Sequence, residues 1–305
     1  NRLETSLAPI LYDATRSIWL EAGSVIDVSG RAHTAIDNQG LRYAHVSAGG
    51  DIHLGGQLLQ PRGLNSPRAL TSAYVVIREG AMLDASGASA EIDYLASNLP
   101  EQRRSMLLAT DGGRIAFDSQ YGVFLDGTLR AHAGGAGALG GELSIALTTP
   151  ILYDHGATGF PRRAVPNFMR RLRSVIVDQT YQSSLGDTLE YGDCIAGCWT
   201  PGQSLEESAA YNAGKPDIVG QARIGVDQVK AGGFDSLTLT SDDVVLFNGD
   251  IALDLGRNLT LAGSIGNFDV DAHVDLGAAY VNFAGGGTMW GNDITYQDRG
   301  TIALG

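Results

Sequence analysis

Two adjacent carboxylates, Asp242 and Asp243 in the stretch TSDDVVLFNG, are the residues whose types best suit acid–base chemistry on a glycan. A pair of carboxyl groups can supply the proton donor and the base for glycoside cleavage. Neighbouring residues on a strand point to opposite faces, so only a turn would bring these side chains together. The stretch also lacks the histidine and basic companions that proton transfer and charge stabilisation require. We therefore predict a solvated turn and assign no catalytic residue.

The histidines are scattered along the chain at positions 33, 45, 53, 132, 155 and 273. None of them is spaced from another as the ligands of a zinc site usually are. We expect wall or surface positions for them, with His45 and His53 on one wall. The sequence predicts no metal site and no cofactor.

A cluster of arginines stands out in the stretch PRRAVPNFMRRLRSVIV, and comprises Arg162, Arg163, Arg170, Arg171 and Arg173. In the same stretch Phe168, Leu172, Val175 and Ile176 follow helical spacing, which predicts a helix with one apolar face. Two interpretations of the arginines stay open. They pair with carboxylates of an acidic wall, or they form a basic protrusion that binds an anionic polymer or a partner.

The elements that would hold these residues announce themselves by repetition. GSVIDVSG begins at position 23 and GAMLDASG at position 80, and the surrounding residues align without a gap at an offset of 57 residues (80 minus 23). A repeated phrase is typical of a structural unit that stacks. We interpret 57 residues as three rungs of about nineteen, each rising by the strand spacing of about 4.8 Å. The Asp and Ser of DVSG and DASG are interpreted as turn residues that bond the local backbone.

A second phrase also recurs, as GGDIHL, GGELSIAL and GGFDSLTL, and each copy has a glycine pair before alternating apolar and polar residues. Alternation with a period of two predicts strands, and glycine pairs suit the turns that lead into them. With 41 glycines, only 9 prolines and 44% hydrophobic residues, the composition favours an ordered chain of short strands. The net charge of −13 argues against nucleic acid as a partner. No apolar run is long enough to cross a membrane.

The chain divides into three parts by pattern. Residues 1–149 and 217–305 alternate like strands of one solenoid, and residues 150–216 break the alternation. We predict that 150–216 is an insertion with short helices, including one at the capping box of Ser204 to Glu207, and that it contains both cysteines. A smaller excursion at about 88–111 is predicted to hold a short helix with Pro100 in its first turn.

The phrases WLEAGSVIDVSG and AGGFDSLTLTSDDVVLFNGDIAL resemble the repeats of filamentous-haemagglutinin-like exoproteins of Gram-negative bacteria. The similarity covers most of residues 15–149 and 220–265. It implies an all-β fold, namely a right-handed parallel β-helix, and export by two-partner secretion through an outer-membrane transporter. It also implies a place outside the cell or on its surface, and a role in adhesion, biofilm or cell contact. The amino-terminal secretion domain of that family is not recognisable, so we expect an internal or carboxy-terminal stretch of a larger protein.

Cys194 and Cys198 stand close together in DCIAGCWTPG. Three intervening residues, one of them Gly197, allow a small disulfide ring, and secretion into an oxidising space would favour it. The pair is too sparse for a structural zinc site. We predict a disulfide that staples a loop tip.

Two functions remain after this reasoning. The first is a non-enzymatic structural and adhesive module of a secreted surface protein, with a surface glycan or a cell receptor as its partner. The second is a carbohydrate-active β-helix enzyme, either a polysaccharide lyase or a glycoside hydrolase. The missing companions of Asp242 and Asp243 favour the first.

Overall fold

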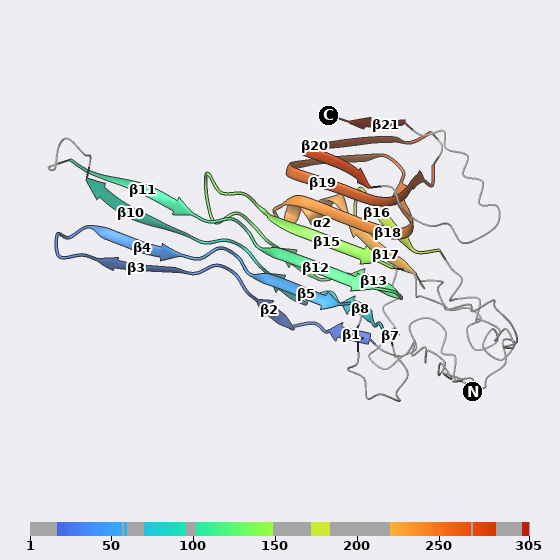
Figure 1. Cartoon of the computed structure of the whole chain (residues 1–305), viewed down its shortest axis with the longest axis horizontal. Coiled ribbons are helices and arrows are strands. Elements are labelled where there is room, and N and C mark those ends of the chain that lie inside the picture. Colours follow the sequence, from blue (N-terminus) through green and yellow to red (C-terminus); the bar gives the residue numbers. More distant parts are fainter. Residues whose placement is uncertain are drawn as a thin grey trace, which may run out of the picture.

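The computed structural model describes residues 17–56, 58–59, 70–95, 102–148, 172–183, 220–269, 271–284 and 301–304, and these are mostly β-strand. Three groups of parallel strands surround one core, and we call them the first, second and third wall (Figure 1). Together they make a large parallel sheet of nearly barrel-like shape. Within the described ranges, no helix has the length and hydrophobicity needed to cross a lipid bilayer.

The first wall contains, in spatial order, β1 (Ser17–Leu20), β8 (Tyr74–Ile77), β13 (Gly122–Leu125), β17 (Gln221–Gly225), β16 (Ser174–Asp178) and the last part of β18 (Phe234–Asn248). The second wall contains β2 (Val25–Asp27), β9 (Met82–Asp84) and β14 (Thr128–Arg130). The third wall contains β5 (Asp51–Gly55), β12 (Arg114–Ser119), β15 (Gly141–Leu147) and the first part of β18.

The later strands β19 (Ile251–Asn267) and β20 (His273–Ala284) bend from one wall to the next, and β21 (Thr301–Leu304) pairs with β20. The described helix α2 (Val226–Ala231) follows β17 and continues the second wall beyond β14. Its carbonyl-side neighbour Gly232 accepts a hydrogen bond from the N–H of Ala131, and Lys230 Nζ donates to the carbonyl of Ala252. The short strands β6 (Leu58–Leu59) and β7 (Leu70–Thr71) form a separate hairpin.

The core is a column of aliphatic side chains that point inward from all three walls. In the third wall Ile52, Ile115, Leu143 and Leu237 are register partners on successive strands, and all four are buried. These residues belong to the recurrent glycine-pair phrases and to GGRIAF between them. The prediction that these phrases are strands entered through turns is confirmed.

The glycine pairs are needed because backbones approach closely at this corner. A Cβ on Gly49 would lie 1.9 Å from the carbonyl oxygen of Ala85, and one on Gly113 would lie 1.9 Å from that of Gly50. Real Cβ atoms do not come this near to a backbone oxygen. The recurring glycines therefore mark contacts between successive strands as well as turns.

The predicted turn chemistry of DVSG and DASG is also confirmed. Asp27 Oδ1 accepts hydrogen bonds from the N–H and the hydroxyl of Ser29, at 2.9 and 2.6 Å. Asp84 Oδ1 accepts from the N–H of Ser86 at 2.9 Å. The pKa of Asp27 lies below its ordinary value because of the Ser29 hydroxyl and then the Ser29 N–H.

The interpretation of the 57-residue offset as three rungs is wrong. Ile18 is the direct register partner of Val75, and Ile26 that of Leu83, so the two phrases lie on neighbouring strands. We define a circuit as the stretch of chain that passes once through all three walls. One early circuit takes 57 residues because each of the first two circuits carries a long hairpin between its second and third walls (Figure 1).

Two further expectations are overturned. Residues 88–111 form no helix in their described part, because β10 (Ser89–Leu95) and β11 (Arg103–Ala109) pair as an antiparallel hairpin. Within the predicted insertion 150–216, Ser174–Asp178 is strand β16, not part of a helix. Val175, Ile176 and Val177 are β-branched and all buried, which suits a strand with neighbours on both sides.

The first wall is buried on both faces. Val75 and Val123 point into the core, whereas Tyr74, Phe124 and Ile176 lie outside the core cluster and are still 3% exposed or less. The rings of Tyr74 and Phe124 stack at 6.4 Å between centroids. The strands of this wall therefore carry nearly continuous apolar runs instead of a strict alternation.

Candidate interaction surface

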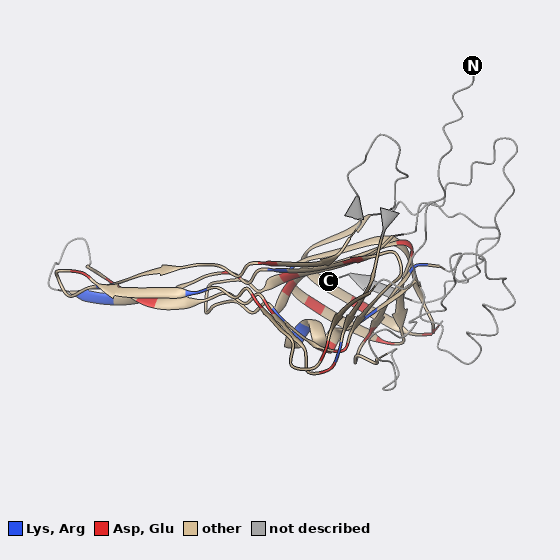
Figure 2. Cartoon of the chain, turned by 90° about the horizontal axis from the view of Figure 1, so that it is seen from below, with Lys and Arg blue, Asp and Glu red and all other residues tan. Residues whose placement is uncertain are grey.

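The two long hairpins project from one corner of the walls as an arm. The first hairpin consists of β3 (Ala32–Ile36) and β4 (Arg42–Val46), and the second consists of β10 and β11. Figure 1 shows the four strands side by side in the order β3, β4, β10, β11, and Figure 2 shows that they make a single thin layer. No core backs this layer, so both of its faces are available for contact.

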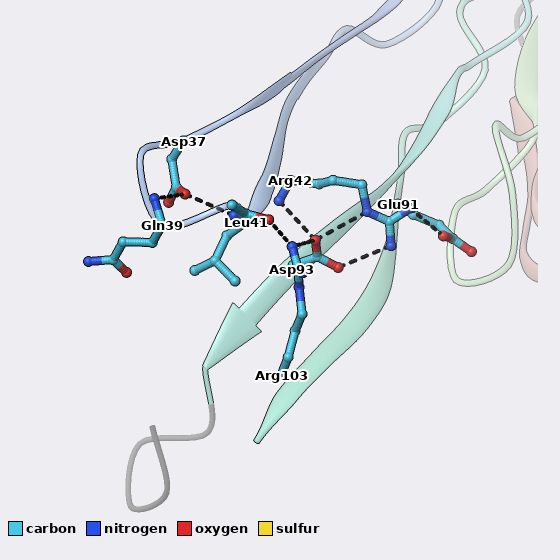
Figure 3. A network of polar contacts seen from close by, with 8 residues as sticks. Asp37, Gln39, Leu41, Arg42, Glu91, Asp93 and Arg103 are labelled. Carbon is cyan, nitrogen blue, oxygen red and sulfur yellow. Dashed lines mark hydrogen bonds and ion pairs between the residues drawn. The ribbon is translucent and has the colours of Figure 1, made fainter. Parts of the chain in front are cut away.

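The tip of the first hairpin is closed by its own side chain. Asp37 Oδ1 accepts hydrogen bonds from the N–H groups of Gln39 and Leu41, both at 2.8 Å (Figure 3). The N–H of Asp37 also donates to the carbonyl of Leu41 at 2.9 Å. This local bonding is the kind that lets a short acidic residue nucleate a turn.

The two hairpins belong to separate sheets, and side chains join them along the seam between β4 and β10. Asp93 Oδ2 accepts hydrogen bonds from the backbone N–H of Arg42 at 2.8 Å and from its Nε at 3.2 Å. Asp93 Oδ1 accepts from Arg42 Nη2 at 3.0 Å, and Glu91 accepts from Arg42 Nη1 at 2.9 Å. Arg103 donates to Asp93 at 2.8 Å and also to the carbonyl of Gly40 (Figure 3). One carboxylate therefore fixes three segments of the arm.

The charges of this network stabilise one another. The side-chain and backbone hydrogen bonds from Arg42 hold the pKa of Asp93 far below its ordinary range. The hydrogen bonds to Asp93 and then to Glu91 raise the pKa of Arg42. Only 4% of the Asp93 side chain is exposed, whereas 43% of Arg42 is, so the carboxylate sits beneath the two guanidiniums.

The base of the arm is fixed by Thr110. Its hydroxyl donates to the carbonyl oxygens of Ser47 and Ala88, both at 3.0 Å, and accepts from the N–H of Ala88. Thr110 thus links the second hairpin to the end of the first. With Asp93 near the tip and Thr110 at the base, the arm is held at both ends.

Register decides which side chains share a face of the arm. Arg42 binds both Glu91 and Asp93, which lie two residues apart on β10, so the face of Arg42 continues into theirs. Cross-strand partners also share a face. We call this the acidic face; its other exposed apolar residues are Ile36, Leu95 and Leu107.

The opposite face of the arm has a different composition, and we call it the acid-free face. By register it carries His33, Ala35, Tyr43 and His45 from the first hairpin, and Ala90, Ile92, Tyr94, Arg104, Met106 and Leu108 from the second. Tyr43, Tyr94 and Met106 are 57%, 40% and 49% exposed. In a chain with net charge −13, a face with exposed aromatic, histidine and arginine side chains and no carboxylate is chemically distinct. Exposed aromatic and arginine side chains are the types enriched in binding surfaces.

The predicted acidic pair lies at a kink of β18, where the register shifts between Thr240 and Val244. Asp243 Oδ2 accepts a hydrogen bond from the backbone N–H of Arg173 at 2.6 Å, which is a structural role. Asp242 makes an interaction of its own. Nearby on β12, burial raises the pKa of Asp118, with a smaller contribution from the charge of Asp242.

The histidines do not lie as expected. His45 is the cross-strand partner of His33 on the arm, while His53 lies on β5 of the third wall. In the part of the chain that the structure describes, no group of three potential ligands is gathered for a metal ion.

Cys194, Cys198, Arg162, Arg163, Arg170 and Arg171 lie outside the described residues. Arg173 is described and is fully buried, so its side chain does not belong to an exposed basic surface. Its carbonyl accepts a hydrogen bond from Ser241 Oγ at 2.5 Å. Arg173 instead anchors the start of β16 against the kink of β18.

The arm itself was missed by the sequence reasoning. A signal was present: the turn-forming stretch DNQG stands midway between Gly30 and Gly49. Alternation alone does not separate a wall strand from a hairpin strand, because both have a period of two. No protein-family model matches the chain, and neither a curated protein nor a solved structure matches it.

Proposed function

We propose that the chain is a segment of a secreted bacterial surface protein, in which a right-handed parallel β-helix carries the arm away from its wall to contact a cell. The acid-free face of the arm is the observation that carries this proposal. The repeat phrases shared with filamentous-haemagglutinin-like exoproteins support the β-helix, the surface location and export by a two-partner transporter. The partner is a surface glycan or a receptor on a host or bacterial cell.

The physical case rests on geometry and surface chemistry. The arm has no core of its own, yet Asp93 and Thr110 hold its hairpins in one layer, so its faces are preorganised. Preorganised surfaces lose less entropy on binding than flexible loops do. Exposed Tyr43, Tyr94 and Met106 supply apolar and aromatic area that a protruding element places within reach of a partner.

Two neighbouring residues of β11 provide a matched test. Met106 lies on the acid-free face and Leu107 on the acidic face, and they are 49% and 44% exposed. The intact chain, fluorescently labelled, is applied to bacterial and epithelial cells, and bound chain is measured over a concentration series. Tyr94→Ser with Met106→Ser is expected to weaken attachment by about tenfold or more, as for the loss of central contact residues.

The control carries Leu95→Ser with Leu107→Ser, which removes similar apolar area from the acidic face. It should attach like the unmodified chain. Equal loss in both variants, or loss in neither, would refute the assignment of the acid-free face. Circular dichroism and thermal melting show whether both variants remain folded.

A further inference from the structure

The outermost strand of the arm has an unpaired edge. All five residues of β3 are exposed, and β3 pairs with β4 alone. The N–H of Ser47 donates to the carbonyl of Arg31, and the N–H of Asp37 donates to that of Leu41. In an antiparallel ladder the hydrogen-bonded positions alternate, so residues 33 and 35 face β4 while the N–H and C=O groups of residues 32, 34 and 36 point away from it. The N–H of Arg42, which by the same alternation points away from β3, indeed donates to Asp93.

The edge of β3 carries none of the features by which proteins block strand pairing. Its sequence is AHTAI, with no proline, no lysine and no carboxylate. It has five regular register pairs with β4 and no bulge. The opposite edge of the arm, on β11, begins with Arg103 and Arg104. Edges that must stay unpaired usually carry such charges.

We propose that β3 pairs antiparallel with β3 of a second copy of this chain, about a two-fold axis at Thr34. This register sets Thr34 opposite Thr34 and Ala32 opposite Ile36, so every outward-pointing N–H and C=O group of residues 32, 34 and 36 finds a partner. Shifting the register by two residues leaves some of these groups unmatched. A two-fold axis also makes the contact self-complementary.

Charge complementarity supports the same register. Counting outward from the axis, Arg31 of one copy lies opposite Asp37 of the other, at each end of the paired strands. The Arg31 side chain is 72% exposed and lies 3.8 Å from its own neighbour Asp27. Asp37 uses one oxygen, Oδ1, for the two hydrogen bonds of the tip. Opposite charges on directly facing residues favour an antiparallel pairing.

The position of the arm removes the main obstacle to association. Each copy has a net charge of −13, so two copies repel one another. The arm carries β3 away from the walls, and antiparallel pairing directs the two bodies to opposite ends (Figure 2). Five-residue strands bury a small interface, below about 1,200 Å², which is typical of weak association.

The experiment is sedimentation velocity of the full chain over concentrations up to about 1 mM, where a dimer of millimolar Kd is well populated. Thr34→Pro removes the outward N–H on both sides of the axis and leaves the ladder to β4 intact, because the N–H of residue 34 points away from β4. We expect its Kd to rise by about tenfold or more. Thr34→Val keeps the N–H and should dimerise like the unmodified chain.

A covalent trap gives a second readout. In a chain with Cys194→Ser and Cys198→Ser, Thr34→Cys places two thiols across the axis, at a Cα separation of about 5.5 Å that a disulfide tolerates. Mild oxidation should give a disulfide-linked dimer, and the tip variant Asn38→Cys should give much less. A chain that stays monomeric at all concentrations would overturn the proposal. So would self-association that Thr34→Pro leaves unchanged, or that Thr34→Val abolishes equally.

Discussion

Asp93 shows how a single carboxylate can organise an element that has no hydrophobic core. Its two oxygens accept hydrogen bonds from the backbone and side chain of Arg42, 51 residues earlier in the sequence, and from Arg103 across its own hairpin. Charge-assisted bonds of this kind are shorter and stronger than neutral ones. The relative position of the two hairpins therefore depends on the ionised state of one residue.

We predict that Asp93→Asn loosens the seam of the arm at neutral pH. The amide keeps one acceptor oxygen but loses the charge, and its NH₂ group faces the donors of Arg42 and Arg103. Hydrogen exchange measured by NMR should be faster at the Arg42 amide, while amides of the walls keep their protection. Glu91→Gln is the control, because Glu91 is 59% exposed and makes a single bond to Arg42. Unchanged exchange at Arg42 in Asp93→Asn would contradict the role given to Asp93.

The same network predicts a pH dependence with a definite sign. The folded pKa of Asp93 lies below its unfolded value of about 4. Its contribution to arm stability is therefore complete above pH 4 or so, and is lost as the pH falls through the lower folded pKa. The difference in Arg42 exchange between the unmodified chain and Asp93→Asn should shrink in that acidic range. A difference that vanished near neutral pH would contradict the lowered pKa.

Residue roles were predictable from sequence where they are local. Asp27 binds Ser29 two residues away, and that pattern identifies the turn without any knowledge of the fold. Asp93 looks equally ordinary in the sequence, because its partner Arg42 becomes a neighbour only when two circuits lie side by side. The burial of Arg173 was hidden for the same reason: its contacts, Ser241 and Asp243, are about seventy residues further along the chain.

At the scale of elements, β16 is the strand that the sequence most misrepresents. Helical spacing of apolar residues at 168, 172, 175 and 176 suggested an amphipathic helix, yet residues 174–178 lie in the first wall. In spatial order β17 lies between β13 and β16, although β16 precedes β17 in the chain. A segment that enters a wall out of sequence order leaves no repeat to recognise.

We predict that Ile176→Ala lowers the free energy of unfolding by about 2–5 kcal/mol, the usual cost of truncating a buried isoleucine. Ile176 is 3% exposed, whereas Ile36 on the arm is 69% exposed. Ile36→Ala is thus the matched control and should change stability by no more than about 0.5 kcal/mol. Denaturant midpoints of both variants provide the measurement. A cost for Ile176→Ala as small as the control would place residue 176 on the surface and refute its position in the wall.

The misread excursion at 88–111 has a simple physical cause. Its two strands alternate poorly because both faces of the arm are exposed, so apolar residues such as Leu95 and Leu107 occur where a wall strand would bury them or omit them. Helix propensity of Met106 and its leucine neighbours then pointed to a helix. Pairing with a partner strand overrides such a weak local preference.

At the scale of the whole molecule, composition and repeated phrases predicted a mostly β chain with parallel neighbours, and the large parallel sheet agrees with this. The length of a circuit was not predictable from the repeat alone. An offset of 57 residues describes three short circuits or one long circuit equally well, and the difference depends on how much chain leaves the wall as a hairpin. The arm exists because each early circuit is long.

The central claim is that residues 57 apart are nearest neighbours, and a cysteine pair tests it directly. Val25 and Met82 are register partners in the second wall, and neither is buried. Adjacent strands lie about 4.8 Å apart, within the range for a disulfide, whereas three intervening rises would separate these residues by about 14 Å. With Cys194 and Cys198 replaced by serine, Val25→Cys with Met82→Cys should form an intramolecular disulfide on mild oxidation, and Val25→Cys with Asp84→Cys should not. Free thiols in the first pair under conditions that keep the chain folded would contradict the account.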